Sequence, residues 1–264
     1  MMAFDAAWKL EQLAPGQFGW TVPDGWQQGR GAFGGLVLGA LVRAAERTLQ
    51  DPDRPLRSIT GELCGPTLVG EALIKVEVLR AGNNLTTLAV RLEQQQEIQA
   101  HAVLIFGNTR PQPLEFTELW PPEQTPWETL EPLPMIPAMP SFARRMEYRL
   151  DGLLPYSQEP SARTHTWVRP RETVERWDAA TLVAMSDAVW PSFMNRMEAP
   201  RPMGTVSYMA ELLDMGEGLE LDQPLYHRGH TIAAHAGYQV ELRELWGADG
   251  RLMLLNQQCL VLIK

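Results

Sequence analysis

Nine prolines lie between residues 111 and 140 of this chain of 264 residues, and they limit how the remainder can fold. Proline lacks a backbone N–H and has a fixed φ, so a segment this rich in proline forms neither a long helix nor a central strand. We expect residues 111–140 to form an extended linker that packs over the surface or is partly mobile. The linker divides the chain into two predicted units, residues 1–110 and 141–264.

The two units show the same order of predicted elements. In the first unit a glycine-rich stretch runs into an apolar helix over residues 29–49, and strands with alternating apolar residues follow over 57–107. In the second, strand-like segments between residues 146 and 170 precede the apolar segment 177–197, and further strands follow between residues 205 and 264. A helix beside runs of antiparallel strands predicts an α+β fold, and the repeated order indicates an internal duplication.

One carboxylate, Asp187, lies in the middle of the apolar segment 177–197, close to Met185 and Val189. Burial raises the pKa of a carboxyl, so a buried Asp needs hydrogen-bond partners or a chemical task. Asp187 therefore either caps a backbone turn or takes part in chemistry. The first predicted helix has no carboxylate before Glu46, so we expect any chemistry to be asymmetric. One unit supplies an acid and the other a glycine-rich helix entrance.

Gly29, Gly31 and Gly34 have the GxGxxG spacing of a dinucleotide-binding motif. That motif indicates a nucleotide site only after a buried parallel strand and within a strand–helix–strand unit. Neither condition is met in this sequence, so we expect no nucleotide cofactor. The backbone N–H groups of such a helix entrance can still face a negative atom at the positive end of the helix dipole.

Composition and charge exclude several classes of protein. A net charge of −9 argues against a nucleic-acid-binding protein, whose binding face would be basic. Cys64 and Cys259 lie far apart in sequence and are typical of free thiols in a reducing compartment. Asp5 interrupts the position where a signal peptide would be apolar, and no stretch is long enough to span a membrane. We expect a soluble, cytoplasmic protein.

Three histidines, His227, His230 and His235, resemble a metal-binding cluster at first sight. On a strand, however, an odd spacing sends two side chains to opposite faces of the sheet. We therefore expect no metal site here.

The segments 29–46, 57–66 and 75–84 (GRGAFGGLVLGALVRAAE, RSITGELCGP and KVEVLRAGNN) resemble the first repeat of the acyl-CoA thioesterase II family closely, and the second unit resembles its second repeat more loosely. The resemblance covers nearly the whole chain outside the linker. It implies a double hotdog fold, in which two tandem repeats, each a helix wrapped by an antiparallel sheet, form one continuous sheet.

The resemblance also implies a catalytic trio. The acid in AMSDAVW is Asp187, the hydroxyl in GTVSYM is Thr205, and the amide in DGRLMLLNQQ is Gln258. Gln258 is preferred to Gln257 because it lies nine residues after Asp249, the spacing that the family's last hairpin suggests.

Hydrolysis of a thioester needs these residue types. Asp187 could orient or deprotonate the attacking water, while Thr205 and Gln258 offer uncharged donors and acceptors that fix its position. The backbone N–H groups near Gly34 and Gly35 are candidates for stabilising the oxyanion. No Ser-His-Asp or Cys-His arrangement is apparent, which favours direct attack by water. We expect an acyl-CoA to be cleaved to free acid and CoA.

Two alternatives remain open. The chain could be a double hotdog protein that binds an acyl or CoA ligand without turnover, or a hotdog hydratase or dehydratase, although no histidine follows Asp187 before His227. The acyl-CoA is the expected partner, and exposed sheet edges favour a homo-oligomer. Four arginines could meet CoA phosphates or form a solvated surface: Arg163, Arg169, Arg171 and Arg176.

Overall fold

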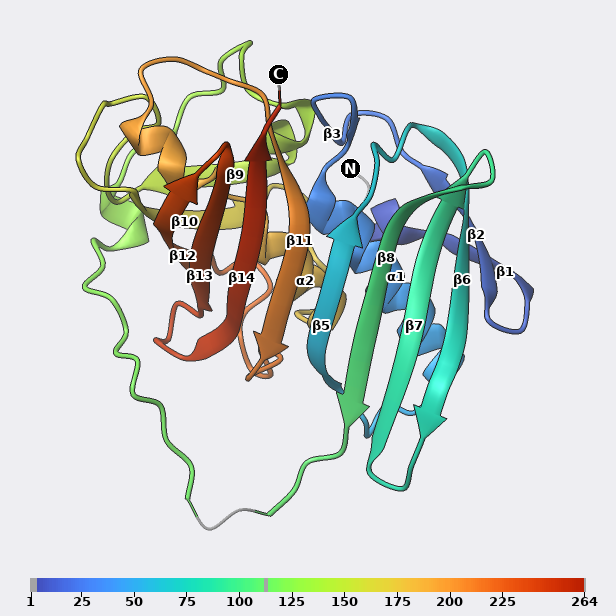
Figure 1. The fold of residues 1–264 in the computed structure, drawn as a ribbon. Coiled ribbons are helices and arrows are strands. Elements are labelled where there is room, and N and C mark those ends of the chain that lie inside the picture. The colour runs from blue at the N-terminus through green and yellow to red at the C-terminus, as the bar shows by residue number, and fades with distance from the viewer. Residues whose placement is uncertain (1–3, 112–113, 264) are drawn as a thin grey trace.

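The computed structural model describes residues 4–111 and 114–263, and within these residues twelve strands form one sheet (Figure 1). Every adjacent pair in this sheet is antiparallel. The strand order is β1-β2-β6-β7-β8-β5-β11-β14-β13-β12-β10-β9. The strands are β1 (Leu10–Ala14), β2 (Gln17–Val22), β5 (Leu56–Leu63), β6 (Gly70–Ala81), β7 (Leu85–Gln94), β8 (Glu97–Gly107), β9 (Met146–Leu150), β10 (Arg163–Pro170), β11 (Met203–Leu212), β12 (Leu225–His235), β13 (Tyr238–Trp246) and β14 (Leu252–Leu262).

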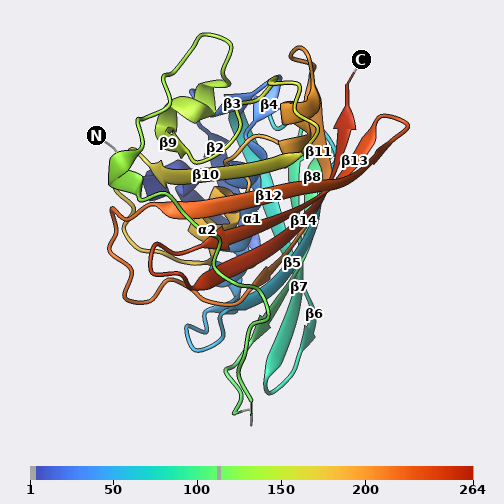
Figure 2. The same ribbon diagram turned by 90° about the vertical axis from the view of Figure 1, so that its left-hand side faces the viewer.

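The strands before the linker form one half of the sheet, and those after it form the other half. The halves meet where β5 pairs with β11, from Ser58 opposite Glu211 to Glu62 opposite Ser207. Helices α1 (Gly34–Leu49) and α2 (Ala179–Ser186) lie together on one side of the sheet, which curls around them (Figure 2). The predicted α+β arrangement of two helix-and-sheet units in one continuous sheet is therefore present.

The two helices are antiparallel and differ in how much of their surface they bury. Eleven of the sixteen residues of α1 are buried, whereas every residue of α2 is buried. Gly35, at the start of α1, lies against Ala184 near the end of α2. At the opposite end Arg43 of α1 pairs with Asp178, the residue that caps α2. Asp187 lies in the middle of the apolar segment 177–197, but α2 covers only the first part of that segment and ends at Ser186, immediately before Asp187.

The glycine-rich stretch before α1 forms a separate two-stranded sheet, β3 (Gln27–Gln28) with β4 (Gly31–Ala32). These short strands are antiparallel, so the stretch lacks the buried parallel strand of a dinucleotide-binding unit. The remaining elements are short 3₁₀ helices: η1 (Phe4–Trp8), η2 (Trp127–Thr129), η3 (Ser141–Arg145) and η4 (Ser192–Arg196).

The linker is extended over residues 114–126 and then packs against the second half of the sheet. Trp127, in η2, joins a small hydrophobic core with Trp167, Tyr226 and Trp246. The guanidinium of Arg149 lies 4.2 Å from the centre of the Trp127 ring. The later part of the linker is therefore attached to the second half by a buried indole, and it holds one turn of 3₁₀ helix that the proline content did not predict.

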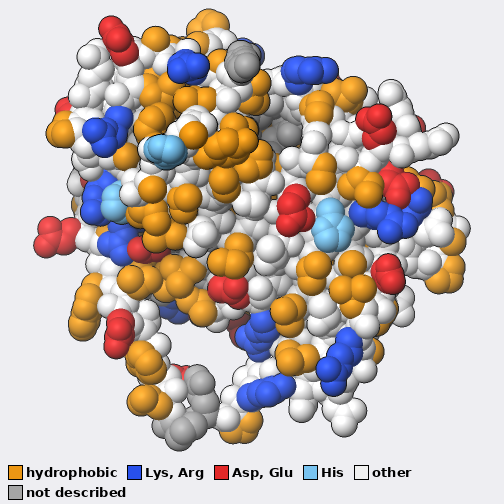
Figure 3. Space-filling model, in the orientation of Figure 1, with side chains coloured by type: hydrophobic (Ala, Val, Ile, Leu, Met, Phe, Trp, Pro, Cys, Tyr) orange, Lys and Arg blue, Asp and Glu red, His pale blue; other side chains and the backbone are white. Residues whose placement is uncertain are grey.

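The outer face of the sheet, opposite the helices, is exposed. Hydrophobic side chains gather on it over the second half of the sheet (Figure 3), among them Met209, Ile232, Tyr238 and Leu242. This face and the edge strands β1 and β9 offer surfaces for the predicted homo-oligomer, which stays a prediction.

Candidate active site

The three side chains named by the family resemblance form one hydrogen-bonded chain. Thr205 on β11 donates from Oγ1 to Oε1 of Gln258 on β14 over 2.9 Å. Gln258 donates from Nε2 to Oδ1 of Asp187, also over 2.9 Å, and to Oδ1 of Asn256 over 3.0 Å. The amide of Gln258 is thus fixed with its oxygen toward Thr205 and its nitrogen toward Asp187. The neighbouring Gln257 is exposed and lies on the other face of β14.

An irregularity in β11 allows Thr205 to reach Gln258. Tyr208 lies opposite Gln258 and is buried on the inner face, so an odd spacing of three would place Thr205 on the outer face. The pairing of β11 with β14 shifts by one residue between Thr205 and Ser207. Such a bulge redirects a side chain, and here it brings the hydroxyl of Thr205 to the inner side.

Asp187 lies at the junction of both halves, directly after α2, and only 8% of the residue is exposed. Burial raises the pKa of its carboxyl. The positive charge of Arg243, the amide of Gln258 and the backbone N–H of Gly35 offset part of that rise, because each stabilises the ionised form. A carboxyl with a raised pKa is a stronger base than an exposed one, as removal of a proton from water requires.

Gly34 and Gly35 allow the start of α1 to approach this carboxyl. A Cβ added to Gly34 would lie 2.8 Å from Oδ2 of Asp187, and one added to Gly35 would lie 2.6 Å from the carbonyl oxygen of Ala184. The first N–H groups of a helix have no partner within the helix. The predicted oxyanion residues are therefore next to the predicted acid, at the positive end of α1.

Two charged residues at the site were not found from the sequence, Glu241 and Arg243 on β13. Nε of Arg243 donates to Oε1 of Glu241 over 2.8 Å, and its Nη1 lies 3.4 Å from Oδ1 of Asp187. The side chains of Glu241 and Arg243 are 0% and 2% exposed. The alternation of apolar and polar residues along β13 predicts that Val240 and Leu242 face the core, yet Leu242 is 42% exposed. The polar face of β13 lies inward because it meets the carbonyl oxygen of Ser186 and the carboxyl of Asp187 at the end of α2.

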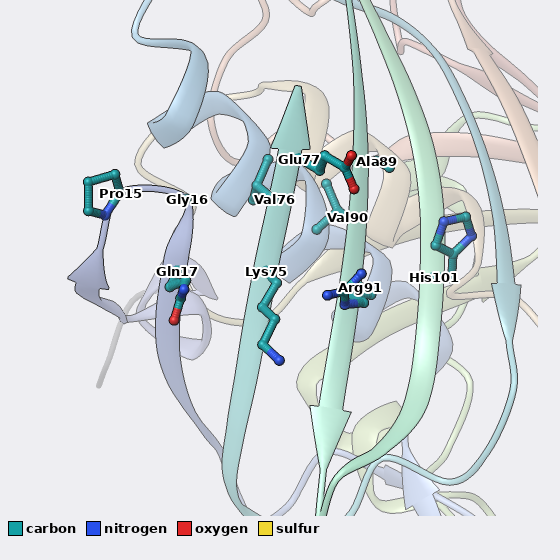
Figure 4. Close-up of a pocket in the computed structure, with 10 residues that line it drawn as sticks. All are labelled: Pro15, Gly16, Gln17, Lys75, Val76, Glu77, Ala89, Val90, Arg91 and His101. Atoms are coloured by element: carbon teal, nitrogen blue, oxygen red, sulfur yellow. The ribbon is translucent and has the colours of Figure 1, made fainter. Parts of the chain in front are cut away.

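A hollow on the outer face of the first half is unrelated to this site (Figure 4). It lies over β6, β7 and β8 and includes Lys75, Arg91 and His101. Both cations pair with one carboxylate, because Glu93 accepts from Lys75 over 2.6 Å and from Arg91 over 2.9 Å. The sheet separates this hollow from Asp187, so it does not extend the candidate active site.

The three histidines are not grouped. His227 is fully buried, His230 is half-buried and His235 is exposed. Across residues 4–111 and 114–263 no group of three or more His, Cys, Asp or Glu side chains could hold a metal ion. In the same residues no helix has the length and apolarity needed to cross a membrane. Cys64 and Cys259 are both free.

The structure is similar to several solved structures over almost its full length. A hot dog fold protein of unknown function from Alicyclobacillus acidocaldarius is 23% identical, with a TM-score of 0.89, over 100% of this chain and 99% of that one. A putative thioesterase II from Thermobifida fusca is 19% identical, with a TM-score of 0.86, over 100% and 98% of the two chains. An acyl-CoA thioesterase II from Mycobacterium marinum is 18% identical, with a TM-score of 0.78, over 99% and 98%. These likenesses confirm the predicted double hotdog fold.

Comparison of the sequence with models of protein families is more specific than the likeness of the folds. Residues 22–107 match the model of the acyl-CoA thioesterase N-terminal domain, and residues 118–262 match that of the acyl-CoA thioesterase C-terminal domain. A comparison with curated proteins found none that matches. Both matches agree with the resemblance inferred from the sequence, and together they span most of the chain. The chain therefore belongs to the acyl-CoA thioesterase family and is a thioester hydrolase by class.

Proposed function

We propose that the chain hydrolyses an acyl-CoA to a free acid and CoA through water activated by Asp187. The observation that supports this most strongly is the hydrogen-bonded chain from Thr205 through Gln258 to Asp187 beside the start of α1. A carboxyl of raised pKa, a hydroxyl and the backbone N–H groups at the start of a helix lie together at this junction. These are the groups that direct attack by water requires.

The hydrogen bonds support different tasks for the three side chains in this proposal. Gln258 uses its nitrogen on Asp187 and Asn256 and accepts from Thr205, so it orients the acid rather than donating to water. Thr205 is half-buried, and its hydroxyl oxygen keeps lone pairs that can accept from a water molecule. In our proposal Asp187 and Thr205 hold the water between them.

The proposed reaction begins when the substrate carbonyl lies at the N-terminal end of α1. Water attacks the carbonyl carbon while Asp187 takes one of its protons, and N–H groups near Gly34 and Gly35 stabilise the oxyanion. Collapse of the tetrahedral intermediate breaks the carbon–sulfur bond. The proton on Asp187 then passes to the departing thiolate, which leaves a carboxylic acid and the thiol of CoA.

The test is thiol release from a panel of CoA thioesters by the purified chain. We expect Asp187→Asn to lower kcat by about 10²–10⁴-fold, the usual contribution of a general base, while the protein stays folded by circular dichroism. Asp178→Asn is the matched control, because Asp178 caps the opposite end of the same helix and Asn is an equally good cap. The control should keep the turnover of the unmodified chain.

Other results would support the alternative functions. Unchanged turnover in Asp187→Asn would refute the role of the acid. Binding of the thioesters without any thiol release would indicate a ligand-binding protein. Loss of an enoyl chromophore without thiol release would indicate a hydratase.

A further inference from the structure

A buried ion pair lies next to the proposed base. Arg243 and Glu241 are two residues apart on β13 and lie on its buried face, where Arg243 donates to the carbonyl oxygen of Ser186 at the end of α2. Burying a charged pair is costly unless additional hydrogen bonds satisfy both groups. Here they do, because Arg243 contacts three different oxygens and Glu241 accepts from three different donors.

The guanidinium is shared unequally between two carboxylates. Its Nε lies 2.8 Å from Oε1 of Glu241, a normal charge-assisted hydrogen bond. Its Nη1 lies 3.4 Å from Oδ1 of Asp187 and 3.3 Å from the carbonyl oxygen of Ser186. The contact with Asp187 is therefore long and shared with a backbone oxygen.

Glu241 cannot move to release the guanidinium. Its Oε2 accepts from the backbone N–H of Ser192 over 2.9 Å and from Oγ1 of Thr231 over 3.1 Å. These donors come from η4 and from β12, so the carboxylate is fixed from two directions. Glu241 in turn fixes the position of Arg243.

We propose that the Glu241–Arg243 pair is a positioning unit for the base: Glu241 holds the guanidinium back from a close ion pair with Asp187, so that this carboxylate stays free to accept a proton. The inference rests on the proposed function, since it assigns Asp187 the role of base. It adds two residues that do not touch the reacting atoms but determine how strongly Asp187 binds a proton.

The surroundings of Asp187 contain few other groups that could do this. The titratable side chains that act on it are Arg243 and Glu241 from β13, Tyr148 from β9 and Tyr208 from β11. Gly34 and Gly35 of α1 lie beside it, and the neutral amide of Gln258 of β14 donates to it. Burial raises the pKa of both tyrosines, so they stay neutral. His227 lies near Arg243, and burial lowers its pKa, so it is neutral as well.

The experiment compares two variants that should act in opposite directions. In Glu241→Gln the guanidinium is released and can close on Asp187, so the pKa of Asp187 should fall by on the order of one unit. In the double variant Glu241→Gln with Arg243→Met both charges of the pair are gone and Asp187 has no cation beside it, so that pKa should rise above its value in the unmodified chain. The readout is a titration of ¹³C-labelled aspartate carboxyls by NMR, with the Asp187 signal assigned by its loss in Asp187→Asn.

A matched control uses the outer face of the same strand. Glu244 pairs with Arg228 on β12, away from the helices, so Glu244→Gln should leave the titration of Asp187 unchanged. The acidic limb of kcat/KM against pH should follow the NMR values, moving to lower pH in Glu241→Gln and to higher pH in the double variant.

The outcomes separate the inference from the proposed function. Shifts in the same direction, or no shift in either variant, would overturn the inference even if thiol release proceeds normally. Opposite shifts in a chain that releases no thiol from any thioester would uphold the inference about proton affinity and refute the proposed function. The NMR titration does not depend on turnover, so it decides the inference in either case.

Discussion

Two neighbouring glycines at the start of α1 should respond differently to the same methyl group. Gly35 lies against the backbone of α2, since an added Cβ would be 2.6 Å from the carbonyl oxygen and 2.9 Å from Cα of Ala184. Backbone atoms cannot rotate away, so the helices must separate by several tenths of an ångström. Forcing an extra carbon into a packed core costs about 1–3 kcal/mol, partly offset by up to about 1 kcal/mol of helix propensity.

At Gly34 the neighbours are side-chain atoms. The added Cβ would lie 2.8 Å from Oδ2 of Asp187 and 2.9 Å from Cδ1 of Leu63. Both atoms are at the ends of side chains and can move, so Gly34→Ala should change the free energy of unfolding by less than about 1 kcal/mol. The movement displaces the carboxylate, and a misplacement of about 1 Å at a reacting group can cost roughly 10²-fold in rate.

The assay is urea denaturation together with thiol release for both variants. Gly35→Ala should lower the free energy of unfolding, with a fall in Tm of about 2–4 °C per kcal/mol. Gly34→Ala should keep the stability of the unmodified chain and lose most of its kcat. Full turnover in Gly34→Ala would contradict the position we assign to Asp187 beside α1. Equal destabilisation in both variants would contradict the distinction between side-chain and backbone neighbours.

Two further predictions concern stability. Burial raises the pKa of Glu46 from 4.5 to about 7, so its contribution to stability is complete below pH 4.5 and is lost as the pH rises through about 7. Glu46→Gln should therefore increase the free energy of unfolding by about 1–3 kcal/mol above pH 7 but not at pH 4. Urea denaturation at both pH values measures this, and an equal effect at both would contradict the prediction. Trp127→Ala removes the buried indole beneath Arg149, so it should destabilise the chain by about 3 kcal/mol and increase proteolysis of the linker. An unchanged cleavage rate would show that the linker is held by other contacts.

Much of the fold could be predicted from local patterns. Phe18, Trp20 and Val22 alternate in sequence and are buried along β2, as a strand with one face on the core requires. The antiparallel order and the α+β class also followed from alternation and turn residues. The pairing of the two halves through β5 and β11 did not, because it joins residues about 150 positions apart and no local signal determines it.

The candidate site was predictable only in part. Asp187, Thr205 and Gln258 were named by resemblance, and the structure brings them together, yet the bulge that turns Thr205 inward has no clear sequence signal. Arg243 and Glu241 were missed because alternating polar and apolar residues indicate two faces without indicating which face is buried. A polar face lies inward here because the sheet meets the end of a helix, and that is a property of the tertiary structure.

The helix pair explains why one chemical site is expected from two similar repeats. At one end, the start of α1 has no side-chain cap of its own and meets the carboxyl of Asp187. At the other end, Asp178 caps α2 by accepting from the backbone N–H of Thr181, and it pairs with Arg43 over 2.7 Å. The helix entrance there is occupied by its own cap, so its N–H groups are closed to a substrate oxyanion. At α1 the residue before the helix is Phe33, which makes no side-chain cap, and the N–H of Gly35 meets the carboxyl of Asp187 from the other half. The start of α1 therefore accepts groups from outside its own helix, and this difference between the two helix entrances makes the duplicated fold chemically asymmetric.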